Sequence, residues 1–501
     1  MRVSKKSAAA LAATLLTTTM LAGCGGDNSA YSMDEEAAGN LKVTYYDESY
    51  FFQQYGNLFN AKFPNVEIEV ASTNSMFRDG VTDYEKAFDD FIAKENPDVI
   101  MVSMDQYAKL VEKDMLLDLE SMLTEEDFKS EDLLPGMIEV LREKGNGKLY
   151  GLSPSFYGQA LYYNKDLFEK YGVPLPQASM SWQEILQLAQ RFPTTGSKDD
   201  RVYGFYMDYY NLTNLGMQIG GTGGLRYLDP AGTKVSLNTD GWKQAFQLAI
   251  DTVNSGAYYA QGMSGENDMP MGGTYESYLS QDKFLSGKAA MTISGSYYLQ
   301  QLEQAEDNIK DYKKFNLGLS TEPVDPANPT VGSSIGANEI FVINAKTPNA
   351  KAAWQLVKYM NGDLAAKLLS RTMNGNLMAR LPYLQDRNGV SLEAFYTLKP
   401  RTDMINQYEN LPQEFYGPFN TVLEKEINSV KDGKKTIDQA LKDAEAAAQI
   451  ELEKAKKAEA ERKAAEAKNA GASEGENAET SPATQEDAPD AVSESAAATA
   501  S

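Results

Sequence analysis

The chain has 501 residues and a formal net charge of −24, with 71 acidic against 47 basic side chains. This balance argues against nucleic-acid binding, which needs clustered cations to hold phosphates. The chain has no histidine, which excludes imidazole-based catalytic triads and the usual imidazole sites for zinc or copper. We therefore expect a globular protein of two or three domains, with no cofactor and no metal site.

The N-terminus has the pattern of an export signal. Basic side chains among the first six residues precede a short apolar stretch, 8–20, which is too short to span a bilayer. The next four residues, LAGC, resemble the lipobox of a bacterial lipoprotein and contain the only cysteine of the chain, Cys24. The resemblance implies a signal peptide over 1–23 and a lipid on the Cys24 sulfur, which anchors the chain at the outer face of the cell membrane. The alternative is a secretory signal with a chance cysteine.

The folded part alternates strand-like and helix-like segments. Residues 24–40 are small, polar and acidic, which predicts a flexible tether. Strand patterns follow at 41–47, 65–70 and 96–103, each with a helical pattern behind it, such as the one that ends before Pro64. This alternation predicts an α/β protein with parallel sheets.

The C-terminal end has a different composition. Residues 436–468 are rich in Ala, Glu and Lys and predict a terminal helix. Residues 469–501 contain no Lys, Arg or aromatic residue, so they cannot bury enough apolar surface to fold alone. We expect 451–501 to form a helical extension followed by a disordered acidic tail.

The most specific signal lies in residues 147–192. This run contains a Gly-x-x-Pro at a strand end, an Ala-Leu-x-Tyr-Asn-Lys strand, a Gly-Val-Pro-x-Pro loop and a Trp-x-Glu-Ile helix start, at Gly151, Ala160, Gly172 and Trp182 respectively. It resembles the family 1 extracellular solute-binding proteins, the sugar-type receptors of ABC importers related to maltodextrin-binding protein. Ser153 before Pro154, and Ile185 in place of Leu, depart mildly from the family pattern.

Three further segments resemble the same family and occur in its order. They are the Pro-Asp-Val strand and helix of 96–119, the Phe-Leu-Ser-Gly-Lys-Ala-Ala-Met run of 284–291, and the small-residue strand and Ala-Ala-Trp helix of 344–360. With the lipobox, the resemblance covers about residues 21–450.

The resemblance implies an α/β fold of the two-lobed periplasmic-binding-protein type (type II), with discontinuous lobes, a hinge and an interlobe cleft. Carried onto this sequence, lobe 1 is expected at 41–157 plus 328–378, and lobe 2 at 158–327 plus 379–450. Closure of the lobes around the ligand would be a hinge motion.

Residues 284–298 also predict local structure. Gly287 suits the left-handed end of a helix, 289–293 suits a short buried strand, and Ser296 suits the N-cap of the next helix. A strand that feeds a helix start is where open α/β sheets bind ligands.

A sugar site needs polar groups for hydroxyls and aromatic rings for C–H faces, and this chain places both where strands are expected to end. The candidates that follow expected strands are Tyr46, Asp47, Glu48, Ser75, Met104 and Asp105, of which the first three also match family positions. The resemblance adds Phe156, Tyr157, Asp208, Tyr209, Tyr210 and Tyr297, and Gly295 and Ser296 lie beside the last of these.

Some of these positions have alternatives. Asp47 and Asp105 could each serve as a helix N-cap instead of a ligand contact. Tyr297 falls where maltodextrin-type relatives have an aromatic that stacks on sugar. Outside the main set, Asn214, Asn338 and Glu339 match the family pattern more loosely.

The resemblance implies a receptor and not an enzyme: a monomeric, lipid-anchored extracellular protein that binds a carbohydrate and delivers it to the permease of an ABC transporter. Only Arg78 lies close to a motif in the sequence, which favours a neutral oligosaccharide. One alternative is a ferric-ion receptor of the same fold that uses tandem tyrosines. Another is a surface glycosidase, which needs two carboxylates about 5–10 Å apart.

Overall fold

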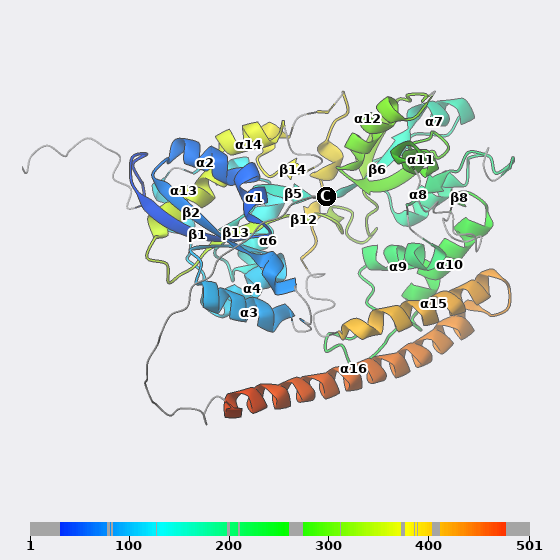
Figure 1. The fold of residues 1–501 in the computed structure, drawn as a ribbon. Helices are drawn as coiled ribbons and strands as arrows, with labels where there is room; N and C mark the ends of the chain where they lie inside the picture. Colours follow the sequence, from blue (N-terminus) through cyan, green and yellow to red (C-terminus); the bar gives the residue numbers. More distant parts are fainter. Residues whose placement is uncertain are drawn as a thin grey trace, which may run out of the picture.

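The structure, a computed structural model, describes residues 31–476 except 78–80, 82–83, 127, 198–200, 209–210, 260–273, 311, 372–375, 385, 388 and 403–410. Helices and strands alternate in the N-terminal half of this part of the chain, so the fold is α/β, as predicted. Figure 1 shows two bodies side by side, joined by strands between them.

The first body is built on a mixed sheet. Its strand order is β2 (Val66–Ser72), β1 (Gly39–Tyr45), β3 (Val99–Val102), β13 (Ile340–Ile343) and β4 (Gly151–Leu152). Strand β1 runs parallel to β2 and β3, as the strand–helix alternation predicted, whereas β13 returns antiparallel between β3 and β4. The side chains of β3 and β13 are buried throughout, as expected for strands covered on both faces.

The second body has its own sheet, in the order β10 (Leu317–Thr321), β6 (Gln159–Asn164), β9 (Met291–Gly295), β7 (Phe205–Tyr206) and β8 (Tyr258–Tyr259). The β10–β6–β9 pairs are antiparallel and the β9–β7–β8 pairs are parallel.

Short strands connect the two bodies (Figure 1). They are β5 (Ser155–Tyr157) between β12 (Gly336–Ala337) and β14 (Leu377–Met378), and the parallel pair β11 (Val331–Gly332) and β15 (Lys399–Pro400). We call these the hinge strands. The lobe boundaries expected from the sequence, near residues 157, 328 and 378, lie beside them.

Helices cover both sheets. Those of the first body are α1 (Glu48–Phe51), a π-helical turn (Phe52–Gly56), α2 (Asn57–Lys62), α3 (Tyr84–Glu95), α4 (Met104–Glu112), α5 (Glu120–Glu125), α6 (Pro135–Lys144), α13 (Ala350–Met360) and α14 (Asp363–Leu369). Those of the second body are α7 (Lys165–Tyr171), α8 (Trp182–Ala189), α9 (Leu212–Thr222), α10 (Asp240–Asn254), α11 (Tyr275–Gln281), α12 (Tyr298–Asn308), α15 (Tyr416–Lys431) and α16 (Ile437–Glu476). Short 3-10 turns occur at Thr73–Phe77, Ser130–Asp132, Leu381–Tyr383, Glu393–Phe395 and Gln413–Phe415.

Local side chains cap two helices of the family motif. Asn164 accepts hydrogen bonds from the Asp166 and Leu167 backbone N–H groups at the start of α7. Ser181 and Glu184 form a reciprocal capping box at the start of α8. The local sequence is sufficient to predict both helix starts.

The terminal helix predicted over 436–468 is present as α16, which packs against α15 and α10. Its inner face is apolar and small, with buried side chains at Ala440, Leu441, Ala444, Ala448, Leu452 and Ala455. The helix continues to Glu476, so disorder from residue 469 was too early an expectation. The rest of the acidic tail lies outside the described residues. Within the described part of the chain, every helix is too short or too polar to cross a bilayer.

Candidate functional site

A cleft of about 1180 Å³ is lined by both bodies and by the hinge strands. The first body contributes side chains of α4 and α6, and the second contributes α9 and α10. The hinge contributes Tyr157 and the segment 333–338. Pockets for small molecules are usually about 300–1,000 Å³, so this cleft has room for an extended ligand.

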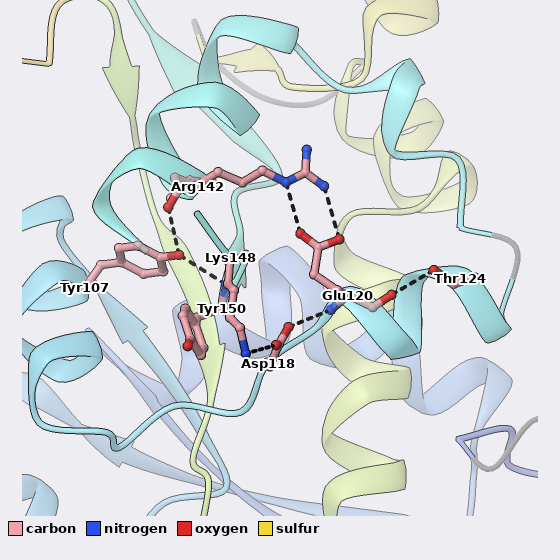
Figure 2. Close-up of polar contacts among 8 residues, drawn as sticks. Tyr107, Asp118, Glu120, Thr124, Arg142, Lys148 and Tyr150 are labelled. Carbon is pink, nitrogen blue, oxygen red and sulfur yellow. Dashed lines mark hydrogen bonds and ion pairs between the residues drawn. The ribbon is translucent and has the colours of Figure 1, made fainter. Parts of the chain in front are cut away.

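In the first wall, a buried tyrosine links the two helices (Figure 2). Tyr107 of α4 donates from its hydroxyl to the Leu141 carbonyl of α6 at 3.0 Å and accepts from the Tyr150 N–H at 3.1 Å. Burial raises the pKa of the Tyr107 phenol, which therefore stays neutral. Met104 and Met137, one from each helix, line the cleft on this wall.

Ion pairs at the surface support the same wall (Figure 2). Arg142 at the end of α6 contacts Glu120 of α5 through two parallel hydrogen bonds of 3.0 and 3.2 Å. Lys148 pairs with Asp118 at 3.0 Å. These side chains are exposed to solvent, which screens the pairs, so they add little to stability and the buried Tyr107 contacts matter more.

The second wall is helix α9, which begins at an Asn211 cap that accepts from the Asn214 N–H at 2.9 Å. Its cleft-facing side chains include Asn214, Met217 and Gln218, which lie on one helical face by their spacing. Trp242 of α10 lies behind this helix and also borders the cleft, although its side chain is 1% exposed.

Tyr157 forms part of the cleft floor at the end of β5. Its ring is 52% exposed and lies over Gly336 of β12, where an added Cβ would be 2.4 Å from the tyrosine hydroxyl. Any larger residue at position 336 would clash with the Tyr157 ring, so glycine is needed there for the ring to take this position. Partial burial and the nearby Asp105 carboxylate raise the pKa of Tyr157, which keeps the hydroxyl protonated as a hydrogen-bond donor.

A buried carboxyl group holds the cleft-lining segment 333–338. Glu322, 2% exposed, accepts from the Ser334 N–H at 3.0 Å and contacts the Ser333 hydroxyl at 3.1 Å. The Ser334 hydroxyl in turn accepts from the Gln159 N–H at 2.8 Å. Burial raises the pKa of Glu322, and its hydrogen bonds oppose that shift. This chain of contacts joins two crossings between the bodies.

Among the described residues that line the cleft, one is acidic, Asp105, and one is basic, Arg401. Arg401 donates through one guanidinium nitrogen to the Gly221 and Thr222 carbonyls at the end of α9, each at 3.0 Å. The sequence showed no arginine near a motif apart from Arg78, which lies outside the described residues. Arg401 is thus a cleft residue that the sequence reasoning missed.

Of the site residues predicted from the sequence, Met104, Asp105 and Tyr157 line the cleft, as do the more loosely matched Asn214 and Asn338. Asp105 is not a helix N-cap. Ser103 holds that position in α4, in a capping box with Gln106, so the cap alternative for Asp105 was wrong.

The predicted residues after β1 and β2 are exposed but lie outside the residues that line this cleft. Asp47 caps α1 by accepting from the Ser49 and Tyr50 N–H groups at 2.9 and 3.2 Å. Tyr46 is 42% exposed, Glu48 is exposed, and the Ser75 hydroxyl donates to the Ser72 carbonyl at 2.9 Å. Ligand contact by these residues stays a prediction.

Other predicted residues are placed away from the cleft lining. Phe156 is fully buried in the core, and the Tyr206 hydroxyl donates to Asp208 at 3.1 Å. Tyr209, Tyr210 and Cys24 lie outside the described residues.

The segment 284–298 differs in detail from its prediction. Gly287 has the expected left-handed backbone, with φ of +72°. The strand lies two residues later than predicted, at Met291–Gly295, so Gly295 is its last residue. The N-cap of α12 is Tyr297 and not Ser296, which is 7% exposed, and no side chain caps this helix. Tyr297 itself is 54% exposed and does not border the large cleft.

Glu339, a looser candidate for ligand contact, is engaged within the first body. It accepts from the Tyr45 hydroxyl at 2.6 Å and from the Tyr55 hydroxyl at 2.9 Å. Burial raises the pKa of Glu339, and the two donors oppose that shift. Within the described part of the chain, no three His, Cys, Asp or Glu side chains are arranged to hold a metal ion.

Several cleft residues could not be identified from the sequence. Met217 and Gln218 lie on helix α9, which follows the predicted positions 208–210 along the chain. Ser333 and Ser334 come from a hinge crossing that carries no motif. A helical-face reading of 211–222 was the one sequence signal that could have found Gln218.

Two α/β bodies, joined by hinge strands around a cleft lined from both sides, define a two-lobed solute-binding receptor. The chain belongs to the bacterial extracellular solute-binding protein family, whose family model matches residues 44–367. Members of this family are solute-binding receptors of ABC transporters, and the family includes receptors for sugars and polyols.

Individual relatives are distant. A binding protein of Brucella abortus (strain 2308) is 23% identical over 446 residues, which cover 83% of this chain and 94% of that protein. The sn-glycerol-3-phosphate-binding periplasmic protein of Escherichia coli (strain K12) is 25% identical over 332 residues, covering 63% of this chain and 69% of that protein. A sugar transporter structure from Rhizobium etli, in an open conformation, superposes with a TM-score of 0.56 at 18% identity, covering 82% of this chain and 99% of that chain.

Proposed function

We propose that this protein is the carbohydrate receptor of an ABC importer and that it holds a neutral oligosaccharide in the cleft between its lobes. The observation that supports this most directly is the chemistry of the cleft lining. Amides at Asn214, Gln218 and Asn338 supply paired donors and acceptors for sugar hydroxyls, while Tyr157 supplies an aromatic face for sugar C–H groups.

The charge of the cleft supports a ligand that is neutral overall. One acidic and one basic side chain, Asp105 and Arg401, are the charged members of the described lining. The Arg401 guanidinium is engaged with two α9 carbonyls. A relative named for sn-glycerol-3-phosphate binding nevertheless makes that compound a necessary competitor in any binding test.

The proposed mechanism is binding and release, without a chemical step. We assign residues 41–157 plus 328–378 to lobe 1 and residues 158–327 plus 379–450 to lobe 2. The two lobes close on the ligand by rotation at the hinge strands. The closed monomer docks on a membrane permease, which opens it and takes the ligand. The protein is held at the outer face of the cell membrane by lipid on Cys24.

The test is isothermal titration with neutral mono-, di- and trisaccharides, with sn-glycerol 3-phosphate and ferric citrate as competing candidates. We expect a neutral oligosaccharide to bind, and we expect native mass spectrometry of freshly purified protein to show a co-purified sugar. Binding of the phosphate compound alone would overturn the neutral-sugar proposal. A visible charge-transfer band with iron would favour the ferric alternative, and shortened glycan products would favour the glycosidase.

Lipid anchoring has a separate test. In the native host, Cys24→Ser is expected to move the protein from the membrane fraction to the medium, because the thiol is the only site for the lipid in this chain. Membrane retention of the variant would contradict the anchor and leave the ligand proposal intact.

A further inference from the structure

Helix α9 carries glycines that differ in what surrounds them. An added Cβ at Gly216 would lie 2.3 Å from the Phe246 ring, and one at Gly220 would lie 2.2 Å from the Trp242 ring. Cβ atoms essentially never approach other heavy atoms so closely, so these two positions need glycine for α9 to pack on α10. The close packing of α9 on α10 therefore explains why residues 216 and 220 are glycines.

Close packing does not explain the glycine at position 221. An added Cβ there would meet no atom within 4 Å, and the residue is absent from the glycines with positive φ. Its backbone is helical, and glycine is less favourable than alanine inside a helix because it loses more conformational freedom. Neither packing nor backbone geometry accounts for glycine at this position.

The open space beside Gly221 is the cleft, since Gly221 is one of the residues that line it. Gly221 follows Asn214, Met217 and Gln218 at helical spacing, so the four residues share the face of α9 turned to the cleft. That face therefore presents two side-chain amides and the thioether of Met217, followed by backbone without a side chain at Gly221.

We propose that Gly221 is a specificity-determining residue: its missing side chain gives room for one ring of a carbohydrate to lie against the last turn of α9, beside Gln218. This inference rests on the proposed carbohydrate function and refines it. A side chain at 221 would occupy the volume that the ring needs and would leave the protein fold undisturbed.

The experiment compares Gly221→Ala and Gly221→Leu with a matched pair, Gly417→Ala and Gly417→Leu. Gly417 lies in helix α15, an added Cβ there also meets no atom within 4 Å, and the residue does not line the cleft. The probe is the tightest binder among maltose, maltotriose, cellobiose, cellotriose and raffinose, titrated calorimetrically against each full-length variant.

We expect Gly221→Leu to weaken binding roughly 10- to 200-fold, the effect of misplaced bulk in a binding pocket, and Gly221→Ala to weaken it less. The melting temperature of both variants should equal or exceed that of the wild type, because alanine and leucine are better helix formers than glycine. The Gly417 variants should keep wild-type affinity.

Failures of the two proposals are distinguishable. If the wild type binds none of the probes, the neutral-oligosaccharide function fails and this inference falls with it. If the wild type binds but Gly221→Leu binds equally well, Gly221 does not determine specificity and the function stands. If both Gly221 variants lose helix content and melt earlier, the glycine serves the fold and the inference is wrong.

Discussion

Tyr157 is the aromatic side chain best placed to contact a ligand, because its ring is 52% exposed and borders the cleft. Tyr157→Ala is expected to lower ligand affinity by about 10- to 150-fold, the cost of losing about 1.5–3 kcal/mol of aromatic contact. Tyr157→Phe keeps the ring and should retain most of the affinity. Titration calorimetry on the two variants measures the difference.

Tyr297 provides the comparison for this prediction. The sequence resemblance makes it the stacking aromatic, and its ring is 54% exposed, but it does not border the large cleft. If Tyr297→Ala weakens binding and Tyr157→Ala does not, the ligand lies nearer the end of β9 than the cleft lining indicates. Equal affinity of both alanine variants and the wild type would contradict both assignments.

Residue-level structure is predictable from the sequence where the determining contacts are local. The caps at Asn164 and Ser181 depend on backbone N–H groups two or three residues away, so the sequence alone is enough. The start of α4 is harder to predict, because the side chains of Ser103 and Asp105 are both suited to the N-cap position. The Ser-x-x-Gln spacing of 103–106 is a capping-box signature and could have decided in favour of Ser103.

At the scale of elements, the pairing of α4 with α6 is the structural basis of the first wall. Tyr107→Phe removes the acceptor of the partly buried Tyr150 N–H and one of two donors to the Leu141 carbonyl, which also accepts from the Gly145 N–H. We expect the free energy of unfolding to fall by about 0.5–1.5 kcal/mol for each of the two hydrogen bonds lost. Urea denaturation of wild type and variant measures this difference.

A matched control for this change is Tyr275→Phe. Tyr275 is 48% exposed on α11, and its hydroxyl contacts Gln304 at the surface. Surface changes of this kind usually alter stability by less than about 0.5 kcal/mol. Equal losses in both variants would show that the Tyr107 contacts have no special role in holding the wall.

Elements with strong periodicity were predictable, and their assembly was less so. The strands of 41–47, 65–70 and 96–103 appear close to their expected bounds because alternating or continuous apolar patterns identify them. The cleft lining at 333–338 and Arg401 comes from segments far apart in the sequence, joined by crossings between the bodies. Neither hydrophobic periodicity nor local motif spacing in the sequence indicates that these segments lie close together in the fold.

At the scale of the whole molecule, buried polar contacts hold the hinge segment 333–338 against the second body. Glu322 follows β10 of the second body and binds Ser334, whose hydroxyl accepts from Gln159 at the start of β6. Because a buried carboxylate is costly without such partners, these contacts favour one arrangement of the crossings. The position of the cleft segment 333–338 thus depends on the packing of the second body.

A second buried carboxyl group, Asp282, makes stability depend on pH. It is 8% exposed and accepts from the Tyr298 hydroxyl at 2.6 Å and from the Phe284 and Leu285 N–H groups at 2.7 and 2.8 Å. Burial nonetheless raises its pKa from 3.8 to about 6, and the nearby Asp208 adds to the shift. The folded state therefore binds this proton more tightly than the unfolded state does.

The sign follows from that difference in pKa. The stabilising contribution of protonated Asp282 is complete below pH 3.8 and is lost as the pH rises through about 6. A carboxyl pKa moved by this amount corresponds to about 3 kcal/mol. Asp282→Asn carries no titrating group, so the unfolding free energy of the wild type relative to this variant should increase by about 2 kcal/mol between pH 7.5 and pH 4, because pH 4 still lies just above the unfolded pKa. Urea denaturation of both proteins across this range measures the change, and parallel pH profiles would show that Asp282 has an ordinary pKa in the folded protein.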